Sequence, residues 1–189
     1  MTALWTSFLV VALAEMGDKT QLVALALAAR YRRPWTVMLG ILLATTANHV
    51  LAATVGVWVS RLLPSTALAW VLAISFLAFG VWTLIPDRSP EAAAAARWGP
   101  LLTTTVVFFL AEMGDKTQLA TVALGARFET AAAVTAGTTL GMMAADGLVV
   151  FGGSHITRIV PPAILRNLAA ALFIALGLVA LAGAIAASR

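Results

Sequence analysis

Apolar residues fill most of the chain in long runs, and polar residues gather in short breaks between these runs. A helix needs about 20 residues to cross the roughly 30 Å hydrocarbon layer of a membrane, so apolar runs near this length indicate transmembrane helices. The pattern predicts an all-α polytopic membrane protein with six transmembrane helices. The predicted segments are residues 3–28, 35–60, 66–85, 100–126, 131–153 and 164–187.

Composition agrees with this prediction and narrows the chemistry. Of the 189 residues, 61% are hydrophobic and 11% are charged, with a mean hydropathy of +0.97. A soluble domain of this size could not keep so much apolar surface from water, so the lipid bilayer is the expected surrounding. The chain has no cysteine, which excludes disulfides, thiolate metal sites and cysteine nucleophiles.

The loops after the first, third and fifth predicted segments hold more basic residues than the loops and termini on the opposite side of the membrane. The net charge is +4, but the arginines are spread through short loops rather than gathered in a patch, so no nucleic-acid partner is expected. The positive-inside rule places the more basic set in the cytoplasm and both termini outside. The first segment contains acids and follows no basic residue, so no cleaved signal peptide is expected. The basic set is Arg30, Arg32, Arg33, Arg88, Arg97, Arg158 and Arg166, against Arg61, Arg127 and Arg189.

The nine-residue stretch AEMGDKTQL occurs twice, at residues 14–22 and 111–119. The same offset of 97 residues superposes other positions without a gap, including Gly40 on Gly137 and Arg30 on Arg127. An offset that holds over so many positions indicates an internal duplication. The two halves are expected to share one helical plan.

The duplication predicts two three-helix repeats, residues 1–85 and 100–189, joined by a cytoplasmic linker at 86–99. Because three is odd, the second repeat must enter the membrane inverted relative to the first. Inverted repeats are a common transporter plan, with a binding site near the middle of the membrane where the repeats meet. We therefore expect the two copies of AEMGDKTQL to face each other.

The two copies of the repeated stretch carry four of the eight acids in the chain. Each carboxylate at the centre of a bilayer costs about 2.5–3.5 kcal/mol on insertion scales, so the acids should face one another rather than lipid. On a continuous helix Glu15 and Asp18 would share a face. Gly17 and Gly114 would allow close helix approach or a local break of the helix. The candidate metal ligands are Glu15, Asp18, Glu112 and Asp115.

The charges of the two copies favour a divalent cation. Four carboxylates and two lysines leave a net charge of −2, which one divalent ion would neutralise. Carboxylate, hydroxyl and amide oxygens suit the hard cations Ca²⁺, Mn²⁺ and Mg²⁺. Without a metal, crowded acids in a low dielectric cannot all stay ionised, so protons should compete for the same oxygens. The residues that add charge or neutral oxygens are Lys19, Thr20, Gln21, Lys116, Thr117 and Gln118.

A second group of candidates lies near the middle of the second and fifth segments. Asn48, His49 and Asp146 are candidate ligands or proton carriers, and the 97-residue offset superposes His49 on Asp146. Met16 and Met113 could supply a soft thioether that favours Mn²⁺, although buried methionines more often serve packing. The alternative for the whole motif is a set of structural ion pairs that hold the helices in register.

At these residues the chain resembles a known family. The hexapeptide EMGDKT, present twice, is similar to the signature E-x-G-D-[KR]-[ST] of the manganese/calcium cation-proton exchangers of Golgi, thylakoid and bacterial membranes. The resemblance implies a secondary transporter of six or seven spans whose motif acids bind the cation. It also implies a bacterial inner membrane, since the chain most resembles the bacterial manganese exporters. The implied motif positions are Gly17, Lys19, Thr20, Gly114, Lys116 and Thr117.

The expected function is export of Mn²⁺, and of Ca²⁺ as an open alternative, in exchange for protons. An exporter of amino acids or other small organic solutes on a similar scaffold is the competing hypothesis. An enzyme is not expected, because the chain has no H-E-x-x-H helix and only two histidines. No cofactor is expected, since metal ions and protons would be the substrates. The sequence leaves the proton stoichiometry and the oligomeric state open.

Overall fold

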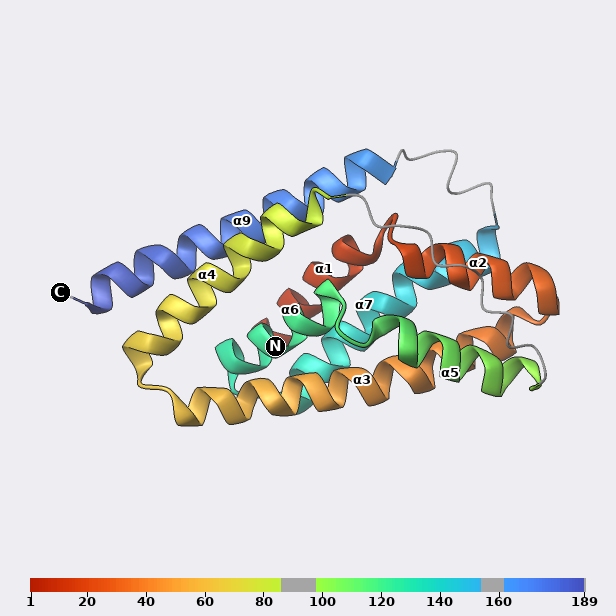
Figure 1. Cartoon of the computed structure of the whole chain (residues 1–189), viewed down its shortest axis with the longest axis horizontal. Coiled ribbons are helices and arrows are strands. Elements are labelled where there is room, and N and C mark those ends of the chain that lie inside the picture. The colour runs from red at the N-terminus through yellow and green to blue at the C-terminus, as the bar shows by residue number, and fades with distance from the viewer. Residues whose placement is uncertain (86–97, 154–161, 189) are drawn as a thin grey trace.

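The structure is a computed structural model that describes residues 1–85, 98–153 and 162–188. Every regular element in these ranges is a helix (Figure 1). The all-helical class predicted from the sequence is therefore confirmed. The elements are α1 (Thr2–Glu15), α2 (Lys19–Tyr31), α3 (Pro34–Leu62), α4 (Ser65–Thr83), α5 (Pro100–Glu112), α6 (Lys116–Phe128), α7 (Ala131–Gly152) and α9 (Pro162–Ala187).

Helices α3, α4, α7 and α9 are long and apolar enough to cross a membrane. They correspond to the predicted segments 35–60, 66–85, 131–153 and 164–187. Proline at the start of α3 and α5 fits this plan, because the first turn of a helix does not need the missing N–H. The four long helices account for four of the six predicted spans.

The other two predicted segments, 3–28 and 100–126, are not single helices. Helix α1 ends at Glu15 and α2 begins at Lys19, and α5 and α6 are separated in the same way. Gly17 and Gly114 have φ angles of 83° and 77°, in the left-handed region that glycine adopts at little cost. Of the two roles considered for these glycines, the structure therefore shows the helix break.

The break also corrects the placement of the acids. Glu15 and Asp18 were expected on one helical face, but Glu15 ends α1 and Asp18 is the N-cap of α2. The two carboxylates therefore start from backbone that runs in different directions. Asp115 is likewise the N-cap of α6, where its side chain accepts a hydrogen bond from the backbone N–H of Lys116.

Close helix packing occurs at a different pair of glycines. A Cβ on Gly40 of α3 would meet Thr104 and the carbonyl of Leu101 on α5. A Cβ on Gly137 of α7 would meet Ser7 and the carbonyl of Leu4 on α1. Each of these residues is 97 positions from its counterpart. The same glycine contact therefore packs α3 on α5 and α7 on α1.

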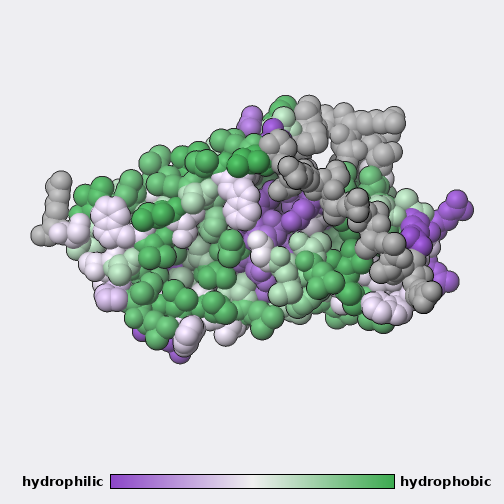
Figure 2. All heavy atoms as spheres, in the orientation of Figure 1, coloured by the Kyte–Doolittle hydropathy of each residue, from purple (hydrophilic) through white to green (hydrophobic). Residues whose placement is uncertain are grey.

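Helices α4 and α9 pack along each other and lie over α1 and α6 (Figure 1). Their outer faces expose large apolar side chains such as Ile74 and Val179. Figure 2 shows a largely hydrophobic surface, with hydrophilic atoms visible near the centre of the view. The acids Glu15, Glu112 and Asp146 are buried, and a largely apolar exterior around buried polar groups is the arrangement that a bilayer requires.

The described arginines lie at both ends of the long helices. Arg30, Arg32 and Arg33 lie where α2 gives way to α3, whereas Arg61 is in the last turn of α3 at its opposite end. Most of the linker predicted at 86–99 lies outside the described residues. So do Arg88, Arg97, Arg158 and Arg189.

Candidate cation site

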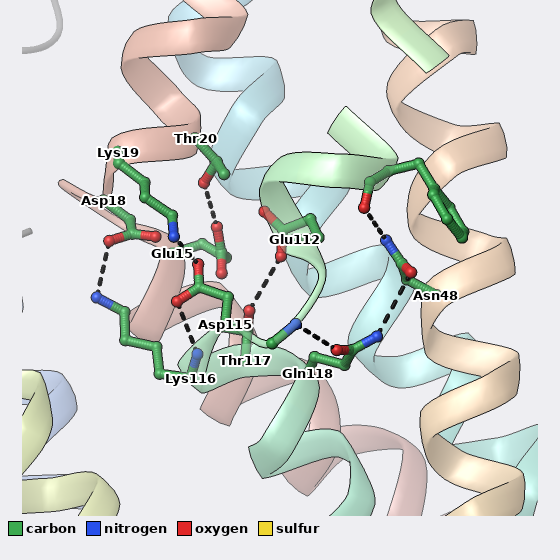
Figure 3. A network of polar contacts seen from close by, with 12 residues as sticks. Glu15, Asp18, Lys19, Thr20, Asn48, Glu112, Asp115, Lys116, Thr117 and Gln118 are labelled. Atoms are coloured by element: carbon green, nitrogen blue, oxygen red, sulfur yellow. Dashed lines mark hydrogen bonds and ion pairs between the residues drawn. The ribbon is translucent and has the colours of Figure 1, made fainter. Parts of the chain in front are cut away.

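The two breaks bring the motif aspartates and lysines together in pairs that join the repeats (Figure 3). Lys116 Nζ lies 2.7 Å from Asp18 Oδ1, and Lys19 Nζ lies 3.2 Å from Asp115 Oδ2. Each lysine therefore binds the aspartate of the other repeat. The Lys116 side chain is 5% exposed and that of Lys19 is 24% exposed, so the first pair is the more buried.

The two glutamates have matched surroundings at the ends of α1 and α5. Thr20 Oγ donates to Glu15 Oε2 at 2.8 Å, and Thr117 Oγ donates to Glu112 Oε2 at 3.1 Å. Both glutamates are buried, and their Oε1 atoms have no hydrogen-bond partner among the described residues. Each glutamate therefore keeps one buried oxygen that a cation or a proton could satisfy.

The motif glutamines hold the two unwound loops. Gln21 Oε1 accepts the Gly17 N–H at 2.8 Å, while its Nε2 donates to the carbonyl of Ala145 on α7 at 2.7 Å. Gln118 Oε1 accepts the Gly114 N–H in the same way, at 2.7 Å. The predicted ligand atoms of both glutamines are thus engaged with the backbone of the break. We interpret these residues as supports of the loops.

Asn48 and His49 are both buried on α3. Asn48 Nδ2 donates to the carbonyl of Phe109 at 3.1 Å, and its Oδ1 lies 3.4 Å from Gln118 Nε2. Asn48 therefore connects α3 to α5 and to the second motif. His49 Nδ1 lies 3.4 Å from Thr139 Oγ, on α7.

Asp146 lies on α7 and is fully buried. Neither carboxylate oxygen has a hydrogen-bond partner among the described residues. The group is close enough to Glu15 and Glu112 to interact with both electrostatically. A buried carboxyl group without a cation nearby is neutralised either by a proton or by a metal ion, so Asp146 has the same need as the two glutamates.

A cavity of about 80 Å³ lies against the Asp18–Lys116 pair. Thr83, at the end of α4, and Arg166, in the first turns of α9, also line it. Neither residue was among the site candidates predicted from the sequence. The 97-residue offset could not reveal Arg166, because its counterpart is Ala69. Its position as the single charged residue of a long, mostly apolar helix was the available signal.

The two motif methionines differ in position. Met16 lines the same cavity, whereas the side chain of Met113 is 57% exposed. The second methionine therefore points away from the buried carboxylates. A pair of thioether ligands would require Met113 to turn inward.

The candidate acids surround the break without forming a metal cage. Among the residues that the structure describes, no three acidic or histidine side chains lie close enough together to hold a metal ion. The reason is visible in the pairing, because each aspartate is held by a lysine. The predicted ligand set Glu15, Asp18, Glu112 and Asp115 therefore stays a prediction. So does the alternative that the pairs serve only structure.

Comparison with known proteins identifies the family. The family model described as "Divalent cation/proton antiporter GDT1" matches residues 3–91 and 100–188. A Vibrio cholerae protein named "Putative manganese exporter" is 45% identical over 94% of this chain and 90% of its own length. A GDT1-like protein of Synechocystis is 30% identical over 82% of this chain and 85% of its own.

More distant relatives occur in rice. "GDT1-like protein 4" of Oryza sativa subsp. indica is 26% identical over 93% of this chain and 72% of its own length. No solved structure matches the chain. The apolar helices, the buried acids and the family match agree on a multi-pass membrane transporter rather than an enzyme. The chain belongs to the GDT1 family of divalent cation/proton antiporters.

Proposed function

We propose that the protein exports Mn²⁺, and also accepts Ca²⁺, in exchange for protons. The observation that carries this proposal is the set of three buried carboxyl groups, Glu15, Glu112 and Asp146, that have no cation partner among the described residues. Buried charges of one sign need neutralisation, and protons and a divalent cation are alternative means. Occupancy by one then excludes the other, which is the requirement for antiport.

The proposed ligands are Glu15 and Glu112. Asp18 and Asp115 would also bind the cation after their ion pairs with Lys116 and Lys19 have broken. With both lysines counted, these four acids carry −2, which one divalent ion or two protons would neutralise. Oxygen ligands of this kind suit Mn²⁺ and Ca²⁺. Asp146 is a further ligand or a proton carrier at the same centre.

The proposed architecture is two inverted three-helix repeats, residues 1–85 and 100–189, with six spans. The broken helices α1–α2 and α5–α6 would count as one span each. Two features support this plan. The glycine contacts of α3 and α7 recur at the 97-residue offset, and Thr45 donates to Met142, its own counterpart, at 3.2 Å. A contact between equivalent residues is what a two-fold axis between repeats requires.

The proposed location is the bacterial inner membrane, with both termini outside. The arginines near the α2–α3 junction support a cytoplasmic end there. Single cysteines added at residue 2 or at residue 32 would test this orientation, because the chain has no cysteine of its own. An impermeant thiol reagent applied to intact spheroplasts should label residue 2 only. Labelling of residue 32 alone would show that the chain has the opposite orientation in the membrane.

The organic-solute alternative finds little support at the motif. The cavity beside Asp18 holds about 80 Å³, and four of its seven lining residues, Asp18, Thr83, Lys116 and Arg166, are charged or carry a hydroxyl group. Such a space suits an ion with some of its water rather than an apolar side chain.

Proton flux in liposomes tests the proposed function. Purified protein should release protons against Mn²⁺ uptake, and Glu15→Gln with Glu112→Gln should abolish the exchange. Glu129→Gln, which removes an exposed acid outside the site, is the matched control and should exchange normally. If wild-type protein moves no protons in response to Mn²⁺, Ca²⁺ or Mg²⁺, the antiporter proposal is wrong.

A further inference from the structure

The chain uses lysine in only two places. Of its 12 basic residues ten are arginine, and the two lysines are Lys19 and Lys116. Arginine is planar and holds a carboxylate through two parallel hydrogen bonds, whereas lysine is a compact, strongly hydrated point charge. A lysine ammonium therefore resembles a metal cation more closely, and it can be displaced with less loss of hydrogen bonding.

Both lysines occupy carboxylates that the proposed cation would need. Lys116 Nζ lies 2.7 Å from Asp18, and Lys19 Nζ lies 3.2 Å from Asp115 (Figure 3). Each pair links one repeat to the other, across the break in both discontinuous helices. Each aspartate thus has a positive partner, and among the described residues the four motif acids are not assembled around one point.

The surroundings also offer each lysine somewhere to go. The Lys19 side chain is 24% exposed, so it is not enclosed on all sides by the protein. Lys116 lines the cavity of about 80 Å³ that also contains Thr83. The Thr83 hydroxyl is buried and has no partner among the described residues. It could therefore accept a hydrogen bond from a displaced Lys116.

We propose that Lys19 and Lys116 are built-in counter-ions that the transported divalent cation displaces from Asp115 and Asp18. The lysines neutralise the aspartates in the metal-free protein, and the metal ion does so in the loaded protein. The aspartates are then never bare when the protein moves between its two access states, which keeps the cost of a buried charge out of both halves of the cycle. This inference rests on the proposed cation/proton exchange.

Two substitutions of Lys116 separate this role from a structural ion pair. Lys116→Gln removes the competing ammonium, so half-saturation should need about tenfold less Mn²⁺. Exchange of external for internal Mn²⁺ should continue, since the metal-free state is not used. Proton-coupled net export should slow at least about tenfold, because that mode returns through a state with Asp18 bare.

Lys116→Arg should shift the affinity in the opposite direction. The guanidinium would hold Asp18 more firmly, so half-saturation should need about three- to tenfold more Mn²⁺ while both transport modes continue. Arg61→Gln, an exposed single-charge change at the end of α3, is the matched control and should leave all three values unchanged. If Lys116→Arg has the wild-type half-saturation and transport rates, and Lys116→Gln slows Mn²⁺ exchange and net export equally, the pair is structural and the inference is overturned.

Chemical labelling of the lysines provides a second test. It uses wild-type protein only, so misfolding of a variant cannot affect the result. The two lysines and the N-terminal amine are the only primary amines in the chain. Brief treatment with acetic anhydride, read by mass spectrometry, should acylate Lys19 several-fold more with saturating Ca²⁺ than without it, relative to the N-terminal amine. Equal or lower labelling with Ca²⁺ would overturn the inference. If wild-type protein transports no cation at all, the proposed function fails first.

Discussion

The two motif loops share nine letters of sequence but not the same surroundings. Around Glu15 and Glu112 they match, since each glutamate is buried and each accepts a hydrogen bond from the threonine five residues later. Around the aspartates they differ. The Asp18–Lys116 pair is shorter and lines a cavity with Arg166, whereas the Lys19 side chain of the other pair is partly exposed.

The neighbouring helices extend the difference. Gln21 donates to a backbone carbonyl of α7, but Gln118 reaches the side chain of Asn48. Asp146 on α7 has His49 as its counterpart on α3. The symmetry of the repeats is therefore kept around the two glutamates and relaxed around the aspartates and the neighbouring helices. Equivalent ligands allow access from both sides, and unequal supports allow the two sides to behave differently.

The largest expected effect tests the matched part of the comparison. Glu15→Gln and Glu112→Gln should each lower Mn²⁺ export about 100-fold, because each replaces the buried carboxylate of a proposed ligand by a neutral amide. Mn²⁺ uptake into everted membrane vesicles, driven by an imposed pH gradient, measures this export activity. The two losses should agree within about threefold, since hydrogen bonding and burial are alike at both sites. A loss confined to one glutamate would break the proposed symmetry of the ligands.

The next effect concerns His49 on α3 and Asp146 on α7, which occupy equivalent positions but differ in residue type. Asp146→Asn should lower export about tenfold, because the buried carboxyl group can no longer gain or lose a proton. His49→Asn at the equivalent position should lower it less than about threefold, since the contact of His49 Nδ1 with Thr139, its only one among the described residues, is 3.4 Å long. Equal losses would show that His49 also takes part in transport.

The smallest effect concerns the two glutamine supports, and stability is the readout. Gln21→Ala should destabilise the protein by about 2 kcal/mol, because it leaves the Gly17 N–H without its partner and removes the hydrogen bond to the Ala145 carbonyl. Gln118→Ala should cost about 1 kcal/mol, since its contact with Asn48 is 3.4 Å long. Thermal unfolding in detergent compares them. A larger loss for Gln118→Ala would reverse the expected order of the two supports.

Much of this organisation could be predicted from the sequence. Apolar run length identified α3, α4, α7 and α9, and the 97-residue offset located both motifs. Periodicity failed at the motifs, because a glycine with positive φ interrupts a helix without changing its apolar pattern. The partners of Asp18 and Asp115 could not be predicted either. Spacing along one chain says nothing about which lysine reaches across from the other repeat.

In the proposed mechanism, one divalent ion is held between the two motif copies. Electron paramagnetic resonance of purified protein with added Mn²⁺ tests it most directly, by counting bound ions. We expect one Mn²⁺ per chain in the wild type and in Glu129→Gln, and none at the same Mn²⁺ concentration when Glu15→Gln and Glu112→Gln are combined. Two ions per chain, or one ion that remains in the double variant, would contradict a shared site.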